Sequence, residues 1–100
     1  MPSTKRQRET DTSTILVLDD ATVTARAWNV VVWDDPVTAM TVVTLILRQV
    51  FQYSNAKAHR LMLQVHNEGR ATVWSGAKGE AGQYCAQLQA LGLLSTIEQN

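Results

Sequence analysis

Cysteine is almost absent from the 100-residue chain, which contains Cys85 and no other cysteine. A single cysteine cannot form an internal disulfide, so the composition suits a reducing compartment and predicts a cytoplasmic protein. Long hydrophobic runs are also missing. The longest apolar stretch, residues 40–51, is interrupted by polar and charged side chains and is too short to cross a bilayer. We therefore expect no transmembrane segment.

Neither sign of charge is in excess, because nine lysines and arginines balance nine aspartates and glutamates. No basic stripe is visible, which argues against nucleic acid as a partner, since phosphate binding needs a clear surplus of lysine and arginine. The basic residues Lys5, Arg6 and Arg8 are followed by Glu9 and Thr10 rather than by a long apolar segment. We therefore expect no secretory signal.

Hydrophobic residues are also scarce at the start of the chain. Residues 1–14 consist mainly of serine, threonine and charged side chains, which bury too little apolar surface to offset the entropy of ordering. We predict that residues 1–14 are disordered, within a flexible tail over residues 1–25, and that residues 26–100 form a folded core. Ile15 to Leu18 forms a short apolar island. We interpret this island as an apolar patch on the tail, with a short edge strand as the alternative.

The rest of the chain shows the periodicities of a small α+β domain. Apolar spacing and capping residues predict, in order, a strand at 28–33, a helix at 37–51, a helix at 54–68, a strand at 71–74, a helix at 79–91 and a strand at 93–97. Thr38 and Ser54 are the predicted N-caps, and Gly69 is the predicted stop of the second helix. This order predicts a small three-stranded antiparallel sheet covered by three helices.

A strand that runs into an acidic turn is the feature around which the chain is organised. Pro36 has no backbone donor, so it must end the strand, and it holds Asp35 in an extended conformation. Asp34 and Asp35 are neighbours in what begins as a strand, so only one of their side chains should enter any given pocket. A solvated turn is the simpler interpretation, and Asp19–Asp20 shows that adjacent aspartates alone mean little. The position of the second pair, between a buried strand and a helix, makes it a candidate site.

Candidates for catalysis or metal binding are few. His59 and His66 lie seven residues apart, which is about 10 Å along a helix and too far for both to bind one ion. Cys85 lies on the apolar face of a predicted helix and is better explained as a core residue than as a nucleophile. No serine lies in a nucleophile-elbow pattern, and no glycine-rich phosphate loop is present. We expect neither an enzyme nor a bound metal or cofactor.

Two motifs resemble those of the ClpS family of adaptor proteins. They lie at residues 33–40, which read WDDPVTAM, and at residues 61–69, which read LMLQVHNEG, and the resemblance extends from Trp28 to Glu98. The Trp-Asp-Asp-Pro form resembles the actinobacterial branch of the family. The resemblance implies an adaptor that binds the free amino terminus of N-degron substrates beginning with Leu, Phe, Tyr or Trp. It also implies delivery of these substrates to a Clp-type AAA+ unfoldase, of the ClpC or ClpA type.

The resemblance further implies roles for particular residues. The amine-binding positions of the family are matched by Asp34, Asp35 and His66. Its hydrophobic pocket is matched by Thr38, Met40, Val43, Met62, Val65 and Leu93. Docking to the unfoldase is implied near Lys78 and Glu80, and the tail is implied to be the segment that the unfoldase engages. The chain departs from the common Asn-Asp-Asp pattern, because Asp34 stands where an amide is common and Pro36 replaces the second aspartate.

Elementary chemistry agrees with a site for an amino terminus. An α-amino group is mostly protonated at neutral pH, so it needs acceptors and negative charge, which Asp34 and Asp35 supply. A neutral His66 ring can accept a hydrogen bond from the amine, whereas imidazolium would repel it, so binding should weaken as pH falls through about 6.5. Met40 and Met62 are flexible enough for varied bulky ligands, although taken alone they are ordinary core residues. Met40 is also expected to exclude β-branched side chains.

Two other functions stay open at this point. A small hydrolase that uses Asp34, Asp35 and His66 is one of them, but the sequence shows no nucleophile for it. The other is a purely structural interaction domain, such as a ribosomal stalk-like module, in which these side chains are solvated or paired with each other. Competition with free amino-terminal leucine peptides distinguishes the adaptor from the structural domain.

Overall fold

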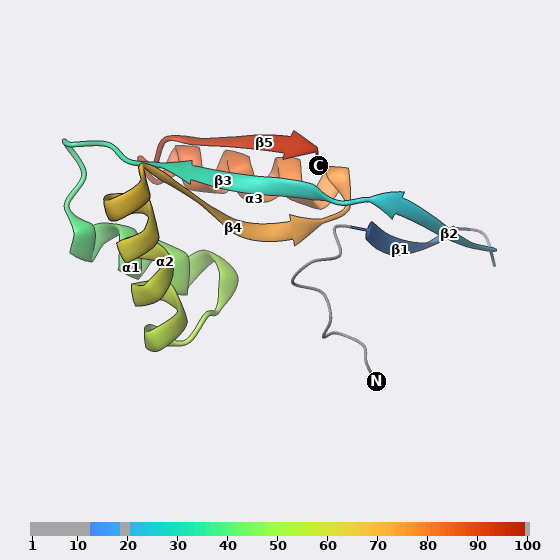
Figure 1. The fold of residues 1–100 in the computed structure, drawn as a ribbon, viewed down its shortest axis with the longest axis horizontal. Coiled ribbons are helices and arrows are strands. Elements are labelled where there is room, and N and C mark those ends of the chain that lie inside the picture. Colours follow the sequence, from blue (N-terminus) through green and yellow to red (C-terminus); the bar gives the residue numbers. More distant parts are fainter. Residues whose placement is uncertain (1–12, 19–20, 100) are drawn as a thin grey trace.

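The computed structural model describes residues 13–18 and 21–99. Its elements are, in order, β1 Ser13–Leu18, β2 Ala21–Arg26, β3 Trp28–Trp33, α1 Met40–Phe51, α2 Asn55–Glu68, β4 Arg70–Gly76, α3 Lys78–Ala90 and β5 Ser95–Gln99 (Figure 1). Within this part of the chain, no helix is long and apolar enough to cross a membrane. The disorder predicted for residues 1–14 falls almost entirely outside the described residues, and the domain boundary at residue 25 stays a prediction.

Strand β3 lies at the centre of a three-stranded antiparallel sheet with the order β4-β3-β5. Val32 of β3 is paired with Ala71 of β4 and with Ser95 of β5. Val30, Val31 and Val32 are at most 1% exposed, as expected of β-branched side chains that fill a pleated surface. The central position of β3 places its carboxyl end, and the acidic turn that follows, between the other elements of the domain.

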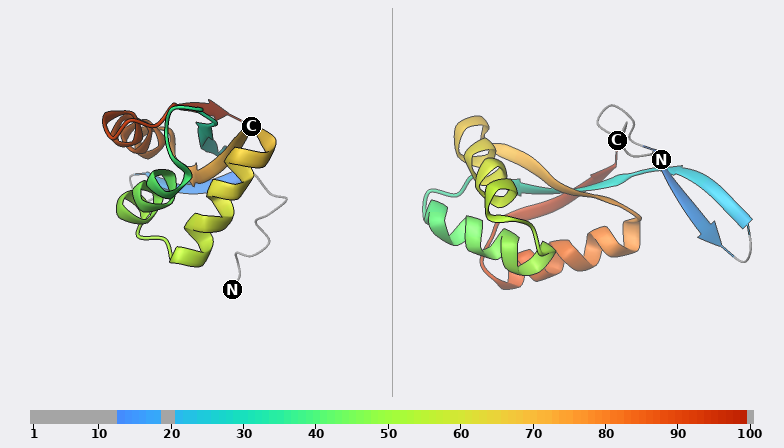
Figure 2. Two further views of the ribbon diagram at one scale, coloured as in Figure 1. Left: turned by 90° about the vertical axis from the view of Figure 1, so that its left-hand side faces the viewer. Right: turned by 90° about the horizontal axis from the view of Figure 1, so that it is seen from below.

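The three helices lie on one side of this sheet (Figure 2). Alternation along β3 directs Val30 and Val32 toward the helices, where they share a core with Leu47 of α1, Met62 of α2 and Leu88 of α3. Removal of this apolar surface from water is the main stabilising contribution to the fold. The predicted architecture, with three helices on one face of a three-stranded antiparallel sheet, is confirmed.

Helix α1 begins at Met40, later than the predicted start at residue 37. The prediction of Thr38 as its N-cap is wrong, because Ala39 occupies that position and makes no side-chain capping hydrogen bond. The physical reason lies upstream. The Asp35 carboxylate accepts a hydrogen bond from the Val37 N–H at 2.9 Å, so these residues form a turn before the helix can start.

The other boundaries agree with the predictions to within a few residues. Helix α2 has the predicted caps, since the Ser54 side chain accepts a hydrogen bond from the Lys57 N–H and Gly69 adopts the left-handed conformation. Strand β4 is longer than predicted, and β5 begins two residues beyond Leu93. The Leu93 N–H donates to the Leu88 carbonyl at 3.0 Å, so Leu93 still belongs to the turn that closes α3.

Strands β1 and β2 form a separate two-stranded antiparallel sheet that extends away from the amino-terminal end of β3 (Figure 1). The interpretation of Ile15 to Leu18 as an apolar patch on a tail is therefore wrong. The segment lies in β1, where Ile15 is paired with Thr24, and its partner is β2 rather than the main sheet. The signal that could have predicted this hairpin is the β-prone sequence ATVTAR of Ala21–Arg26.

Candidate binding pocket

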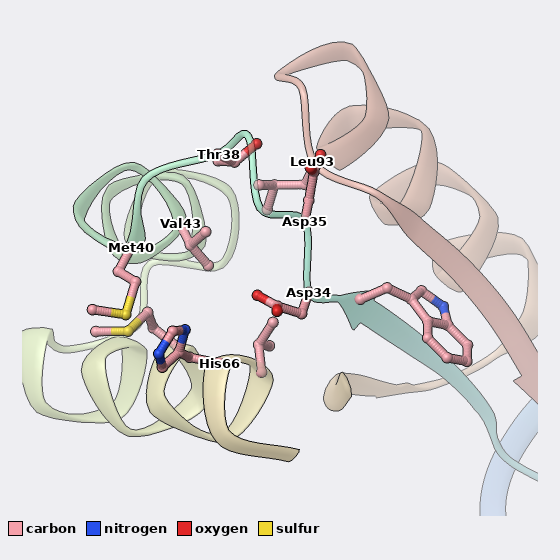
Figure 3. A pocket seen from close by; sticks show the side chains of 10 residues that line it. Asp34, Asp35, Thr38, Met40, Val43, His66 and Leu93 are labelled. Atoms are coloured by element: carbon pink, nitrogen blue, oxygen red, sulfur yellow. The ribbon is translucent and has the colours of Figure 1, made fainter. Parts of the chain in front are cut away.

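An open pocket lies where the carboxyl end of β3 meets α1, α2 and the segment before β5 (Figure 3). It contains about 290 Å³ of space, part of it open to solvent. Its walls are formed by Trp33, Asp34, Asp35, Thr38, Met40, Val43, Met62, Val65, His66 and Leu93. The structure thus brings together every residue that the sequence assigned to the amine and side-chain sites, and it adds Trp33.

The two aspartates of the acidic turn have different surroundings. Asp34 is exposed, its N–H donates to the Gly69 carbonyl at 2.9 Å, and its carboxylate points into the pocket on the side of His66 (Figure 3). The Asp35 side chain points away from His66, and its Oδ1 accepts the hydrogen bond from the Val37 N–H. The alternation expected of a strand therefore continues into the turn, and it separates the two carboxylates.

Trp33 holds the end of β3 in place beside the pocket. Its N–H donates to the Leu94 carbonyl at 2.9 Å, and its indole Nε1–H donates to Thr96 Oγ1 at 2.9 Å. The Arg70 guanidinium lies 4.7 Å from the centroid of the ring and forms an ion pair with Glu98 at 2.8 Å. These contacts join β3 to β4 and β5 directly before Asp34, so Trp33 restrains the backbone from which the pocket carboxylate projects.

Helix α2 supplies the imidazole and part of the apolar wall. Met62 and Val65 are 5% and 3% exposed, because they lie on the face that packs into the core. His66 follows directly on Val65 but is exposed, and it lies in the last turn of the helix before the Gly69 cap. The ring is therefore open to solvent and to a ligand while the helix that carries it is fixed by the core.

The apolar part of the pocket combines buried and exposed side chains. Val43 and Leu93 are 8% and 5% exposed, whereas Met40, at the start of α1, is 42% exposed. Met40 has this exposure because the turn at residues 36–38 delays the helix and leaves its first residue at the edge of the core. An exposed thioether next to a buried apolar wall suits a slot for a flexible range of hydrophobic groups.

Other candidate residues lie outside this pocket. Cys85 is buried, with its Sγ 3.3 Å from Ser95 Oγ, which agrees with its interpretation as a core residue. Lys78 and Glu80 lie in the first turn of α3, and Lys78 Nζ is 4.9 Å from the centroid of the Trp28 ring. Among the described residues, no group of three or more His, Cys, Asp or Glu side chains could hold a metal ion.

The fold and the pocket define a class of protein, namely a small α+β domain with an open site whose acidic and imidazole groups adjoin an apolar wall. Comparison with known protein families identifies the family within this class. The sequence model described as "ATP-dependent Clp protease adaptor protein ClpS" matches residues 23–96, which include β3, β4 and all three helices and end within β5. The chain belongs to this family of Clp protease adaptors.

Individual relatives agree with this assignment. The chain is 46% identical over 78 residues to the ATP-dependent Clp protease adapter protein ClpS of Mycobacterium tuberculosis (strain ATCC 25618 / H37Rv), covering 78% of this chain and 77% of the relative. It is 49% identical over 75 residues to that of Nocardia farcinica, covering 75% and 71%. The structure of Agrobacterium tumefaciens ClpS2 bound to L-phenylalaninamide matches with a TM-score of 0.72 at 26% identity, over 74% of this chain and 96% of that one.

Proposed function

We propose that this protein binds the free α-amine and the bulky hydrophobic first residue of N-degron substrates and delivers them to a Clp-type AAA+ unfoldase. The observation that carries the proposal is the composition of the pocket, in which a carboxylate and an imidazole adjoin an apolar slot. The structural neighbour from Agrobacterium tumefaciens was solved with L-phenylalaninamide. That ligand joins a free amine to an aromatic side chain, and these groups correspond in chemistry to the acidic and the apolar parts of this pocket.

In this proposal the amine is bound by Asp34 and His66. The ammonium group has three N–H donors, and the Asp34 carboxylate offers it both a negative charge and acceptor oxygens on the pocket side of the turn. His66 accepts a further hydrogen bond while its ring is neutral. Asp35 adds negative charge nearby, but its Oδ1 is already bonded to the Val37 N–H, so its main contribution is the shape of the turn.

The first side chain of the substrate then occupies the apolar slot of Thr38, Met40, Val43, Met62, Val65 and Leu93. Leu, Phe, Tyr and Trp fit, because methionine side chains adapt to ligands of different shape, whereas Met40 at the mouth crowds β-branched side chains. Filling the slot contributes about 1.5 to 3 kcal/mol, and each charge-assisted hydrogen bond about 1.5 to 3 kcal/mol. Because association costs at least about 4 kcal/mol, we expect micromolar or weaker affinity for an isolated peptide.

The protein carries out no reaction of its own in this proposal. Its partner is an unfoldase of the ClpC or ClpA type, which docks near Lys78 and Glu80 and engages the amino-terminal tail. Both residues lie at the start of α3, whereas the pocket lies at the end of β3, so docking leaves the pocket open to a substrate. Tethering then raises the effective concentration of the substrate at the unfoldase, which compensates for the modest affinity of the pocket.

The first experiment measures binding of two fluorescent peptides by anisotropy, one that begins with phenylalanine and has a free amine, and one that is identical but amino-acetylated. We expect only the free amine to bind, and we expect Asp34→Ala and His66→Ala each to weaken that binding by about tenfold or more. His59→Ala is the matched control, because His59 is an exposed histidine of the same helix outside the pocket. Equal binding of both peptides, or no binding of either, would contradict the proposal.

A second experiment addresses delivery. Charge reversal by Lys78→Glu together with Glu80→Lys should weaken capture of the protein by the amino-terminal domain of a ClpC-type unfoldase while leaving peptide binding unchanged. Degradation of a reporter with an amino-terminal phenylalanine should fall in parallel. Unchanged capture by the double variant would show that docking uses a different surface.

A further inference from the structure

Leu93 differs from the other pocket walls in the part of the chain that supplies it. Among the described residues that line the pocket, Leu93 alone lies between α3 and β5, whereas the others lie at the end of β3, in the turn that follows it, in α1 or in α2 (Figure 3). The slot is therefore closed on one side by the short segment 91–94. The width of the slot depends on how firmly this segment is held.

Backbone hydrogen bonds fix part of this segment. The Leu93 N–H donates to the Leu88 carbonyl at 3.0 Å, and the Leu94 carbonyl accepts the Trp33 N–H at 2.9 Å. Gly92 has a φ of 101°, which lets the chain turn out of the helix directly before Leu93. These contacts place Leu93 beside the end of α3, whereas the hydrogen bonds that join β5 to α3 involve side chains.

Ser95 and Gln89 make the side-chain contacts that join the start of β5 to α3. Ser95 is 2% exposed, and its Oγ donates to the Cys85 carbonyl at 3.1 Å and lies 3.3 Å from Cys85 Sγ. Gln89 Nε2 donates to the Ser95 carbonyl at 2.9 Å and lies 3.5 Å from Cys85 Sγ. The strand is thus bound to the helix at one residue through both its side chain and its carbonyl. A buried polar group with its partners in place is costly to displace, because displacement leaves those partners unpaired.

These bonds have a simple structural interpretation, in which they only stabilise the contact between α3 and β5. Two observations favour a further task. Ser95 lies two residues beyond Leu93, so a shift at the start of the strand is transmitted to the pocket wall. Gln89 is exposed and lies outside the core cluster, yet its side chain donates to the residue at which β5 begins. An exposed side chain of this kind adds little to the core but restrains the segment that carries Leu93.

We propose that Gln89 and Ser95 are positioning residues that fix the Leu93 wall of the slot and thereby set how the protein discriminates between the first side chains of bound polypeptides. This inference rests on the proposed function and extends it to two residues that do not line the pocket. A wall held in place gives full contact to a side chain that fits, because no further ordering is needed on binding. The same wall excludes a side chain that is too large, because it cannot retreat.

The test compares two free-amine peptides that differ only in their first residue, leucine or tryptophan, by anisotropy with the full-length chain. Gln89→Glu keeps the length of the side chain but replaces the donating Nε2 by a carboxylate oxygen, which only accepts. We expect this variant to raise the ratio of the tryptophan affinity to the leucine affinity by about threefold, because a wall that retreats admits the larger ring and loses contact with leucine. Gln87→Glu is the matched control, because Gln87 is an exposed glutamine of the same helix that does not contact Ser95 through its side chain, and it should keep the ratio.

Two further measurements support the comparison. Ser95→Ala removes the buried donor and should shift the ratio in the same direction as Gln89→Glu. The methyl resonances of Leu93, observed by carbon–proton correlation spectroscopy without any peptide, should move in Gln89→Glu and stay in place in Gln87→Glu. Because Gln89 is exposed, its variant leaves the core cluster intact, so the result does not depend on whether Ser95→Ala folds.

The outcomes separate this inference from the function on which it rests. If Gln89→Glu lowers both affinities by the same factor, the bonds support only the fold, and the positioning role is refuted while amino-terminal recognition stands. An unchanged ratio, or an equal shift in Gln87→Glu, also refutes it. If neither peptide binds the unmodified chain, or an amino-acetylated leucine peptide binds equally well, the proposed function fails. The Leu93 resonances then decide alone whether Gln89 positions this wall.

Discussion

Asp34 and Asp35 are adjacent in the chain, but the structure gives their carboxylates different tasks. One points into the pocket toward His66, and the other accepts a hydrogen bond from the turn that shapes the pocket mouth. A carboxylate that contacts a cationic ligand raises the affinity through its charge. A carboxylate that fixes a turn needs only an acceptor oxygen at the right position. Substitution by asparagine, which keeps one oxygen and removes the charge, distinguishes the two tasks.

We expect Asp34→Ala to lower the affinity for a free-amine phenylalanine peptide by about tenfold to a hundredfold, because a charge-assisted hydrogen bond is lost. Asp35→Asn should change the affinity by less than about threefold, because the amide oxygen can still accept from the Val37 N–H. The loss of affinity for Asp35→Ala should lie between the losses for Asp34→Ala and Asp35→Asn. Anisotropy titrations measure all three variants. A loss for Asp35→Asn as large as that for Asp34→Ala would assign the amine contact to Asp35.

The exposed His66 ring predicts a pH dependence of binding. A peptide amine becomes more fully protonated as pH falls from 7.5 to 5.5, which by itself would favour binding, so a loss of affinity over this range reports on the protein. We expect weaker binding at the lower pH, since a protonated ring has no acceptor and repels the ammonium group. His66→Gln keeps a neutral acceptor and should bind with nearly the same affinity at both values. If His66→Gln retains the full pH dependence of binding, His66 is not the source of that dependence.

Most of the pocket could be predicted from the sequence, because most of its residues fall into two contiguous motifs that resemble those of the ClpS family; Val43 and Leu93 lie outside both motifs and were matched through the same resemblance. Trp33 could not be assigned a role in this way. Its indole donates to Thr96, 63 residues away, and the Arg70 that lies over its ring is paired with Glu98. Contacts of this kind depend on the strand order of the sheet, which local patterns do not specify.

At the scale of the elements, helix starts show where local signals compete. Thr38 and Ser54 are both good capping residues, but only Ser54 accepts a hydrogen bond from its own helix. The upstream Asp35 turn displaces the start of α1 to Met40, so the N-cap falls on Ala39, which has no capping oxygen. Capping propensity alone therefore predicted the N-cap of α2 correctly and that of α1 wrongly.

This difference predicts three changes in stability. Ser54→Ala should lower the free energy of unfolding by about 1 kcal/mol, because it removes a cap, whereas Thr38→Ala should stay within about 0.5 kcal/mol of the unmodified chain. Ala39→Ser should raise it by about 0.5 to 1 kcal/mol, because it supplies the missing cap. Urea unfolding followed by circular dichroism measures all three. Equal losses for Thr38→Ala and Ser54→Ala would mean that Thr38 caps α1 in solution.

Tyr53 ties the connection between α1 and α2 to the sheet. Its hydroxyl donates to the Val73 carbonyl at 2.6 Å. The pKa of Tyr53 is raised above its usual 10.0, mainly because the side chain is partly buried and to a smaller extent because Tyr84 lies nearby. Because the pKa of Tyr53 is higher in the folded than in the unfolded chain, the protonated hydroxyl stabilises the fold. This stabilisation is complete below pH 10 and is lost as pH rises through the folded-state pKa. Tyr53→Phe should cost about 0.5 to 1.5 kcal/mol at pH 7. It should also make unfolding less sensitive to pH above 10, and an unchanged alkaline profile would contradict this account.

At the scale of the whole molecule, the architecture followed from the order and periodicity of the elements, whereas the hairpin of β1 and β2 did not. Among the residues whose burial is described, the core cluster is drawn from residues 30–93, with Trp28 and Ile97 packed against it, and the pocket from residues 33–93. The hairpin of β1 and β2 forms a sheet separate from the one that contains β3. β1 and β2 pair with each other and not with β3, β4 or β5. The order of the elements in the main sheet therefore gives no indication of this hairpin, and the apolar island at Ile15 to Leu18 was open to two interpretations.

The same separation predicts that a chain of residues 26–100 folds and binds without the segment before it. Ala27, at 4% exposed, is retained in this chain, and so is every strand of the main sheet. We expect its thermal midpoint to lie within a few degrees of that of the full chain, since a change of 1 kcal/mol corresponds to about 4 to 8 °C in a domain of this size. Its affinity for a free-amine phenylalanine peptide should be unchanged. Reporter degradation by the unfoldase should fall, because the truncated chain lacks the segment that we propose the unfoldase engages. Weakened peptide binding would show instead that the hairpin supports the pocket, and the boundary at residue 25 would then be wrong.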